Sequence, residues 1–288
     1  MIAGILQNVR SYDPTRTLTL RNQFSNDADR RFNRIATSIY QKLVRDQFLS
    51  VRHLRVITQA EEPLLPVDPI RVSQFMGWIR RQIDKELLSS SGGRFFLPAA
   101  FQSPSETWMY PFIVRSYTRG IQRAEAELKR AGYRVQDTNF NSVQLPVHDA
   151  EITTIHQSSL TILQRITREL DSDILSILTA AAGITIREIY DKIKSRIEKS
   201  TKQVRRLVRT EASRAHHKAV VAMYDWYRVR GVYVLAEILT ARDERVCMTC
   251  ASLEGEVYTL EEVRDLIPVH PLCRCMILPV SRIPNRLF

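Results

Sequence analysis

Apolar residues recur at the spacing of an α-helix through most of this chain after about residue 26, and this pattern restricts the fold more than any other feature. Within residues 26–48 the apolar positions include Phe32, Ile35, Ile39 and Leu43, which are three or four residues apart. Such spacing places these side chains on one face of a helix, and that face has to be buried. The sequence therefore predicts a mainly α fold with an elongated helical body.

Short start and stop signals indicate where the first helices lie. Asp27 and Asp29 are expected in the first turn of the first helix, where the helix dipole favours acidic groups. Asp68 followed by Pro69 is typical of the start of a second helix, which the segment SSSGG would end. A third helix is expected to stop at Gly132.

The middle of the chain is expected to contain longer helices. Residues 133–149 show no regular pattern and are interpreted as a linker. A long helix should follow and end at Gly183. Capping boxes at residues 185–188 and 200–203 are expected to start two further helices, the last of which Gly231 would stop.

After the last long helix, the character of the sequence changes. The stretch VYVLAEILT is the first convincing strand, and the segment TLEEVRDL, with a capping box at Thr259 and Glu262, predicts a short helix. The body is thus followed by a small C-terminal α+β module. The expected domains are an N-terminal helical region, residues 1–134, a long-helix region with a basic last helix, residues 135–231, and the module, residues 232–288.

Positive charge is concentrated between Lys192 and Arg230, a segment that includes the last long helix. The chain has a formal net charge of +11, and residues 192–230 contain twelve basic and three acidic residues. Such a basic segment is typical either of a solvated helix face or of a surface that faces nucleic acid. The residues proposed to contact nucleic acid are Lys199, Lys202, Arg205, Arg206, Arg214 and Lys218.

The sequence also bears on the cellular location. No stretch approaches the roughly 20 apolar residues that a transmembrane helix needs, so no membrane segment is expected. The opening residues, MIAGILQNVRSYD, lack the basic region, the apolar core and the cleavage site of a signal peptide. A reducing compartment is therefore expected, and this argues against a disulfide framework.

Every cysteine of the chain lies within one segment of 29 residues. Cys247 and Cys250 form a C-x2-C knuckle, and the segment HPLCRC supplies His270, Cys273 and Cys275. Two such pairs, brought together by a returning chain, can complete a tetrahedral zinc site. We therefore predict a closed, structural zinc site rather than a catalytic one.

The sequence alone leaves the choice of ligands open. Five candidates compete for four places. Cys273 and Cys275 would share a face if CRCMI is a strand, whereas His270 and Cys273 have the usual H-x2-C spacing. The alternative interpretations are ordinary buried or free thiols, and a cysteine nucleophile with His270 as its base. No catalytic residues are expected, because no oxyanion-donor loop or orienting third group accompanies the pair.

Two polar groups of the last long helix are interpreted as structural. His216 and His217 are expected to be surface or core side chains rather than ligands. Arg209, Thr210 and Glu211 are expected to hold a buried or interfacial salt bridge.

Several spaced motifs of the C-terminal third occur together in a fixed order. A helix bears Arg-Thr-Glu, a strand follows, an Asp precedes C-x2-C, a Leu-x-Gly comes next, and His-Pro-x-Cys-Arg-Cys closes the pattern. This combination resembles the signature of phage head morphogenesis proteins, the Mu-type minor head (minor capsid) proteins of tailed phages. Upstream stretches such as FMGWIRRQID and YTRGIQRAEAEL resemble the N-terminal helical region of these proteins. The matching positions are Arg209, Thr210, Glu211, Asp243, Cys247, Cys250, Leu253, Gly255, His270, Pro271, Cys273 and Cys275.

The resemblance implies a structural, non-enzymatic protein that acts in head assembly, DNA packaging or DNA ejection. The implied partners are the portal protein, with a scaffold or major capsid protein as a further candidate, and the packaged double-stranded DNA. The implied location is the virion, at the capsid interior or portal vertex, and the host cytoplasm during assembly. Some relatives carry toxin or protease domains beyond the Cys/His module, and none is expected after Cys275 here.

Two rival functions are compatible with parts of the sequence. The first is a DNA-binding protein that uses a zinc module and a basic helix outside any virion. The second is a metal-dependent nuclease of the HNH sort, which also uses cysteine knuckles. The nuclease needs a further set of His and Asp or Asn residues, and His270 is the only histidine after Cys250.

Overall fold

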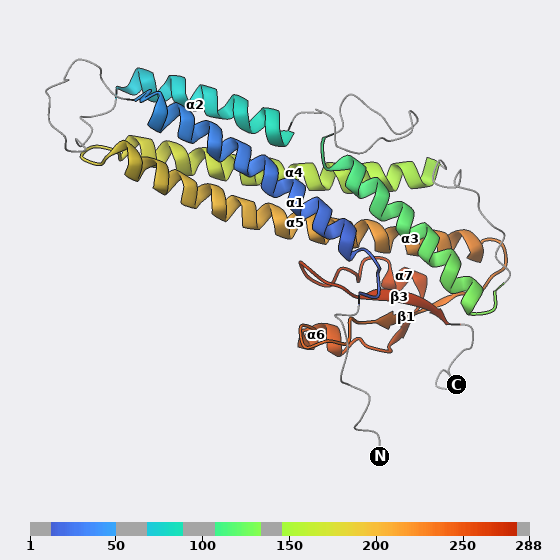
Figure 1. Ribbon diagram of the computed structural model, residues 1–288. Coiled ribbons are helices and arrows are strands. Elements are labelled where there is room, and N and C mark those ends of the chain that lie inside the picture. The colour runs from blue at the N-terminus through green and yellow to red at the C-terminus, as the bar shows by residue number, and fades with distance from the viewer. Residues whose placement is uncertain (1–12, 50–67, 89–106, 134–145, 281–288) are drawn as a thin grey trace, which may run out of the picture. The chain divides into compact units, whose positions relative to one another are not determined.

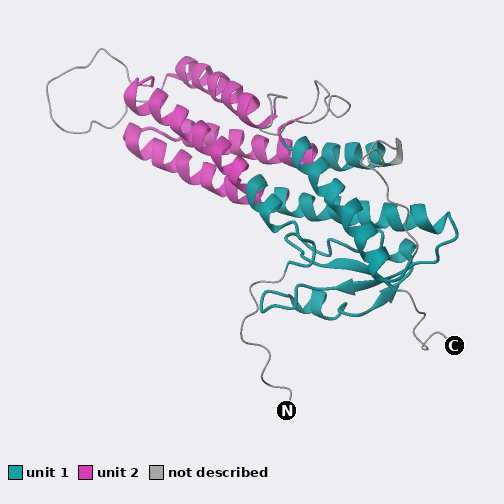
Figure 2. Cartoon of the chain, turned by 45° about the vertical axis from the view of Figure 1, so that its right-hand side comes forward, with its two compact units in different colours: residues 1–24, 109–158, 208–288 teal, residues 25–108, 159–207 magenta. Residues whose placement is uncertain are grey.

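The computed structural model describes residues 13–49, 68–88, 107–133 and 146–280 (Figure 1). These residues form two compact units, shown separately coloured in Figure 2. Unit 1 comprises residues 1–24, 109–158 and 208–288, and unit 2 comprises residues 25–108 and 159–207. The division into three domains at residues 134 and 231 stays a prediction.

Helices account for most of the described residues, so the predicted fold class, mainly α with a small C-terminal α+β module, is confirmed. The long helices are α1 (Leu18–Tyr40), α2 (Pro69–Ile83), α3 (Tyr110–Arg130), α4 (Pro146–Thr179) and α5 (Ile186–Arg228). Short π-helical turns follow two of them, η1 (Gln41–Arg45) and η2 (Asp84–Leu88).

Several predicted helix ends are confirmed. Asp68 caps α2 by accepting a hydrogen bond of 2.9 Å from the backbone N–H of Ile70. Gly132 follows α3 with a φ of +87°, in the left-handed region that closes helices. The capping box before α5 is also present, because Thr185 and Glu188 exchange hydrogen bonds of 3.2 and 2.7 Å with each other's backbone N–H.

Three of the expected boundaries are wrong. Helix α1 begins at Leu18, whose backbone N–H donates to Asp13 at 2.6 Å, so Asp27 and Asp29 lie inside the helix. No helix starts at residues 200–203, because α5 is continuous and the buried Ser200 lies within it. The predicted linker is helical from Pro146 onward. Residues 134–145 of that linker and the predicted loop at residues 89–93 lie outside the described residues.

Unit 2 consists of the parts of α1, α4 and α5 that fall within its bounds, together with α2 and the two π-helical turns. Its core is apolar at helix spacing, as the sequence predicts. Ion pairs flank this core: Asp29 binds the guanidinium of Arg205, and Asp171 binds that of Arg80. The buried side chains include Ile35, Ile39, Leu43, Phe75, Ile79, Leu163, Leu170, Ile174, Ile189, Ile193 and Val204.

Unit 1 contains the C-terminal module and the helices that support it. Its sheet has the order β2-β1-β3, with β1 (Leu235–Leu239) paired antiparallel to both β2 (Val257–Tyr258) and β3 (Met276–Val280). Two one-turn helices, α6 (Met248–Ala251) and α7 (Leu260–Val263), complete the module. Helix α3 contacts β3, and α7 contacts β1 and β2.

Helices α3 and α5 approach each other unusually closely within unit 1. A Cβ atom added to Gly120 of α3 would lie 2.3 Å from the carbonyl oxygen of His216 and 2.7 Å from the Cβ of Ala219. Glycine is therefore required here for packing, and the contact places the backbone of α5 directly against α3.

Candidate metal centre

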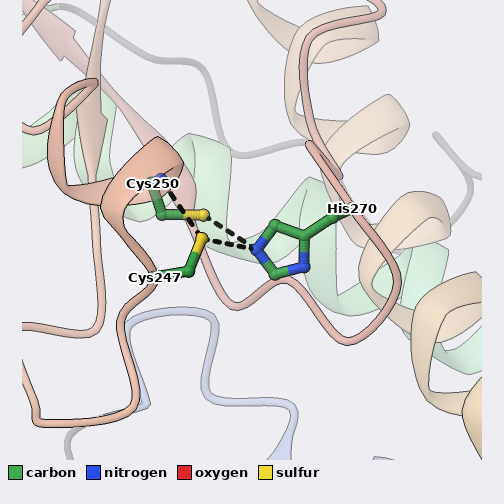
Figure 3. Close-up of side chains that lie close together, drawn as sticks. All are labelled: Cys247, Cys250 and His270. Carbon is green, nitrogen blue, oxygen red and sulfur yellow. Dashed lines mark hydrogen bonds between the residues drawn. The ribbon is translucent and has the colours of Figure 1, made fainter.

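The knuckle formed by Cys247 and Cys250 is one helical turn. Cys247 caps α6, and the backbone N–H of Cys250 points to its Sγ at 3.4 Å. This turn brings the two sulfur atoms to the same side of the chain, where both face the ring of His270 (Figure 3).

His270 faces the knuckle from the second loop of the module. Its Nε2 lies 3.2 Å from Sγ of Cys247 and 3.1 Å from Sγ of Cys250. Its Nδ1 lies 2.8 Å from the carbonyl oxygen of Pro271, to which a protonated Nδ1 donates a hydrogen bond. That contact raises the pKa of His270 and leaves the lone pair on Nε2, toward the two sulfurs. The ring thus has the orientation and tautomer of a metal ligand.

Cys273 and Cys275 complete the cluster from its buried side. Sγ of Cys273 lies 3.9 Å from Sγ of Cys250, and the sulfurs of Cys250, Cys273 and Cys275 all lie within 4.8 Å of one another. The suggestion that CRCMI is a strand is wrong, because β3 begins only at Met276. The structure nevertheless brings all five predicted candidates together, in two groups that share Cys250.

The donor set and the spacing fit a zinc ion. Thiolates and imidazoles are the preferred ligands of zinc, and a tetrahedral site places two sulfurs about 3.8 Å apart and a sulfur and a nitrogen about 3.5 Å apart. The observed separations of 3.9, 3.2 and 3.1 Å are close to these values. The two groups, Cys247 with Cys250 and His270, and Cys250 with Cys273 and Cys275, could each contribute ligands to a metal.

The thiols of the cluster have very different ionisation properties. The backbone N–H of Cys250 lowers the pKa of Cys247, and a hydrogen bond with Cys275 lowers the pKa of Cys273 to about 5. Burial instead raises the pKa of Cys250 to about 12. Several thiolates this close together are mutually unfavourable unless a cation compensates their charge, and a bound divalent metal would supply that cation.

Helix α5 holds the HPLC turn and the end of α7 through contacts that the sequence did not reveal. The hydroxyl of Thr210 accepts a hydrogen bond of 3.1 Å from the backbone N–H of Leu272, inside the HPLC turn. Two turns later, the ring of His217 lies 3.0 Å from the carbonyl oxygen of Val263, at the end of α7. The turn that carries His270 and Cys273 is therefore fixed to the helix.

A second set of contacts connects the two metal-binding loops with each other. Both oxygens of Asp243 bind the guanidinium of Arg274, at 2.6 and 2.5 Å, and the backbone N–H of Arg245 donates to Asp243 at 3.1 Å. A bidentate pair fixes orientation as well as distance. Asp243 precedes the knuckle and Arg274 lies between Cys273 and Cys275, so this pair holds the two halves of the cluster together. Asp243 belongs to the family signature, but its partner was not foreseen.

The polar residues of α5 are buried or paired, as the sequence suggests, but the salt bridge has a different basic partner. His216 and His217 are both buried. Glu211 is buried and paired with Arg214 at 3.1 Å, whereas the side chain of Arg209 donates to Asn22 at 3.2 Å. The expected salt bridge exists, but Arg209 is not its basic partner.

The six residues proposed to contact nucleic acid differ in how free their charges are. Arg205 binds Asp29, Arg214 binds Glu211, and Lys218 binds Asp265 at 2.6 Å. Lys199, Lys202 and Arg206 are exposed on α5. Among the described residues, no carboxylate forms an ion pair with Lys199 or Lys202. Nucleic-acid contact by these residues stays a prediction, with less free charge than the sequence suggests.

These features define a class of protein: a mainly helical chain whose small C-terminal α+β module carries a cysteine/histidine cluster. Residues 176–278, which include all of α5 and the whole cluster, match the family model described as Phage Mu protein F like protein. Over this range the chain is therefore similar to the Phage Mu protein F-like domain, and the resemblance to phage head morphogenesis, or minor head, proteins seen in the sequence is confirmed there.

The other comparisons add two findings. Neither the curated proteins nor the solved structures yielded a match to the chain. Within the described residues, no helix combines the length and the apolar character that crossing a membrane requires. The upstream resemblance, outside residues 176–278, stays a prediction.

Proposed function

We propose that this protein is a structural, non-enzymatic minor head protein of a tailed phage that associates with the portal vertex. The observation that carries the proposal is the Phage Mu protein F-like domain, which covers α5 and all five residues of the Cys/His cluster. The protein would act in head assembly, DNA packaging or DNA ejection.

The cluster supports a structural role for zinc. Four protein ligands leave no open coordination position for water, which a catalytic zinc requires. Metal binding in modules of this size supplies on the order of 10 kcal/mol of apparent free energy, and this becomes folding free energy. Zinc would therefore hold together the loops around Cys247 and His270 and keep the module rigid.

The proposed partners and location follow from the family. The portal protein is the main partner, a scaffold or major capsid protein is a further candidate, and packaged double-stranded DNA lies nearby. The protein would occupy the capsid interior or portal vertex of the virion, after assembly in the host cytoplasm. No membrane partner is proposed.

The test is co-expression of the chain with the portal protein encoded by the same genome, followed by sedimentation. Comigration that survives high salt and nuclease treatment is the expected result. A Cys250→Ser variant should lose comigration if the zinc module forms the contact. Thr249→Ala, an exposed position between the two knuckle cysteines, is the matched control. Free sedimentation of the wild-type chain would contradict the portal assignment.

A second candidate function, DNA binding through α5, is favoured by the exposed Lys199 and Lys202. Phosphate contacts make DNA affinity fall steeply as salt rises. The logarithm of the binding constant falls with the logarithm of the salt concentration, with a slope of about one per neutralised phosphate. A Lys199→Gln/Lys202→Gln variant should lower both the affinity for a duplex and its salt dependence. Arg80→Gln/Arg187→Gln, whose cations are paired with Asp171 and Asp191, is the control. Equal binding by both variants would leave α5 a solvated face.

A further inference from the structure

The structure supports a choice among the five candidates of the metal centre. We propose that the metal ligands are Cys247, Cys250, His270 and Cys273, and that Cys275 contacts the ligand sulfurs without coordinating the metal. This assignment rests on the proposed zinc site and specifies its donor set as three thiolates and one imidazole.

The first argument is the local geometry of the HPLC turn. The backbone N–H of Cys273 donates to the carbonyl oxygen of His270 at 3.1 Å, so the two residues close one turn. Leu272 takes a φ of +67°, a conformation that is costly for a leucine, and its backbone N–H is held by Thr210. The fold thus maintains a strained turn whose effect is to bring His270 and Cys273 together. A tightly held turn of this kind is expected where two ligands must converge.

The second argument is the contacts that the cysteine sulfurs make within the cluster. Sγ of Cys247 accepts the backbone N–H of Cys250, and both knuckle sulfurs face Nε2 of His270. Sγ of Cys273 contacts the knuckle at Sγ of Cys250, 3.9 Å away. Cys273 therefore brings a sulfur from the turn of His270 to the knuckle at the separation expected of two zinc ligands.

The third argument concerns the position of Cys275 in the chain. Cys275 directly precedes Met276, which pairs with Leu239 at the start of β3. It directly follows Arg274, whose guanidinium binds both carboxylate oxygens of Asp243. Both neighbours are thus fixed by contacts that do not involve the metal. The 3.9 Å between the sulfurs of Cys250 and Cys273 is already close to the sulfur separation of a tetrahedral zinc site, about 3.8 Å, so these two need little movement.

One observation favours the rival set, in which Cys275 replaces Cys273. A small cavity beside the cluster is lined by Cys247, Cys250, His270 and Cys275. The two sets make opposite predictions for single substitutions, so the choice between them can be tested directly.

The experiment compares Cys273→Ser and Cys275→Ser in the full-length protein. Zinc content per chain is measured by mass spectrometry, and the thiolate-to-metal charge-transfer absorption is measured after replacement of zinc by Co²⁺. Cys275→Ser should keep one metal per chain with an unchanged charge-transfer band. Cys273→Ser should lose the metal or bind it at least tenfold more weakly. The reverse pattern, or equal losses in both variants, would overturn the assignment.

A further variant guards against simple misfolding. Cys273→His keeps a side chain that can ligate zinc, so it should retain metal while the Co²⁺ charge-transfer band falls by about a third, from three thiolates to two. An unchanged band in this variant would show that Cys273 is not a ligand. Failure of the wild-type chain to bind zinc at all would overturn the zinc site itself. The portal proposal is tested separately, by sedimentation.

Discussion

The contact between α3 and α5 at Gly120 gives the sharpest prediction about stability. A Cβ at this position would lie 2.3 Å from the carbonyl oxygen of His216 and 2.7 Å from the Cβ of Ala219. The first atom belongs to the backbone of α5, which cannot rotate away as a side chain can. Gly120→Ala must therefore push the two helices of unit 1 apart.

The magnitude follows from two opposing effects. Extra methyl groups in a packed core cost about 1–3 kcal/mol, and a contact with backbone belongs at the upper end of that range. Alanine in a helix interior returns about 1 kcal/mol relative to glycine. The expected net loss in the free energy of unfolding is therefore about 2 kcal/mol.

Gly77 of α2 provides the matched control. A Cβ there would meet only Nη1 of Arg81, at 3.7 Å, which is ordinary contact with the end of a flexible side chain. Gly77→Ala should therefore stabilise the protein, by up to about 1 kcal/mol. Urea unfolding of both zinc-loaded variants is followed by circular dichroism at 222 nm and by tryptophan fluorescence. The free energy of unfolding should fall for Gly120→Ala and rise for Gly77→Ala. A Gly120→Ala variant as stable as the wild type would refute the close approach of α3 and α5.

Three further predictions concern unit 1 and its module. Thr210→Val should cost about 1 kcal/mol, because the N–H of Leu272 loses its partner, and should raise the protease sensitivity of the HPLC turn; unchanged cleavage would contradict the contact. Cys250→Ser, or chelation of zinc, should unfold the module beyond about residue 235, which limited proteolysis and circular dichroism would detect; resistance equal to wild type would speak against structural zinc. Acid should destabilise unit 1, because burial lowers the pKa of His216 to about 3 and of His217 to about 4. Below about pH 6.5 the unfolded chain binds protons that the folded chain does not, so the free energy of unfolding should fall by about 2 kcal/mol per histidine between pH 7 and pH 5. Urea unfolding at both pH values measures this change. A urea midpoint that does not depend on pH would show that these rings are accessible to protons in the folded state.

The helices could be predicted from the sequence because each buries one periodic apolar face, but their ends depended on contacts elsewhere. Asp27 looked like a first-turn residue, whereas its carboxylate is paired inside the helix with Arg31 at 3.0 Å. The capping pattern at Ser200 likewise occurs within α5. Residues 186–228 contain neither glycine nor proline, so nothing interrupts the helix there.

The metal cluster was predictable for a local reason. The C-x2-C and H-x2-C spacings each form within one turn of chain, so they appear directly in the sequence. The contacts that support the cluster join distant residues. Thr210 and Leu272 are 62 positions apart, and Asp243 and Arg274 are 31 apart. A single sequence gives no indication of such pairings, which only the folded module creates.

These distant contacts also change how the basic character of α5 is understood. In the segment of α5 within unit 1, Lys218 binds Asp265 and Arg228 binds Glu261, so basic side chains attach the helix to the module. A cation that is already paired with a carboxylate offers little net attraction to phosphate. Any contact of α5 with DNA must therefore depend on the part before Thr210, where Lys199 and Lys202 lie exposed. If α5 binds DNA as proposed, substitutions at Lys199 and Lys202 should weaken DNA binding, whereas substitution of Lys218 should weaken the attachment of the helix to the module.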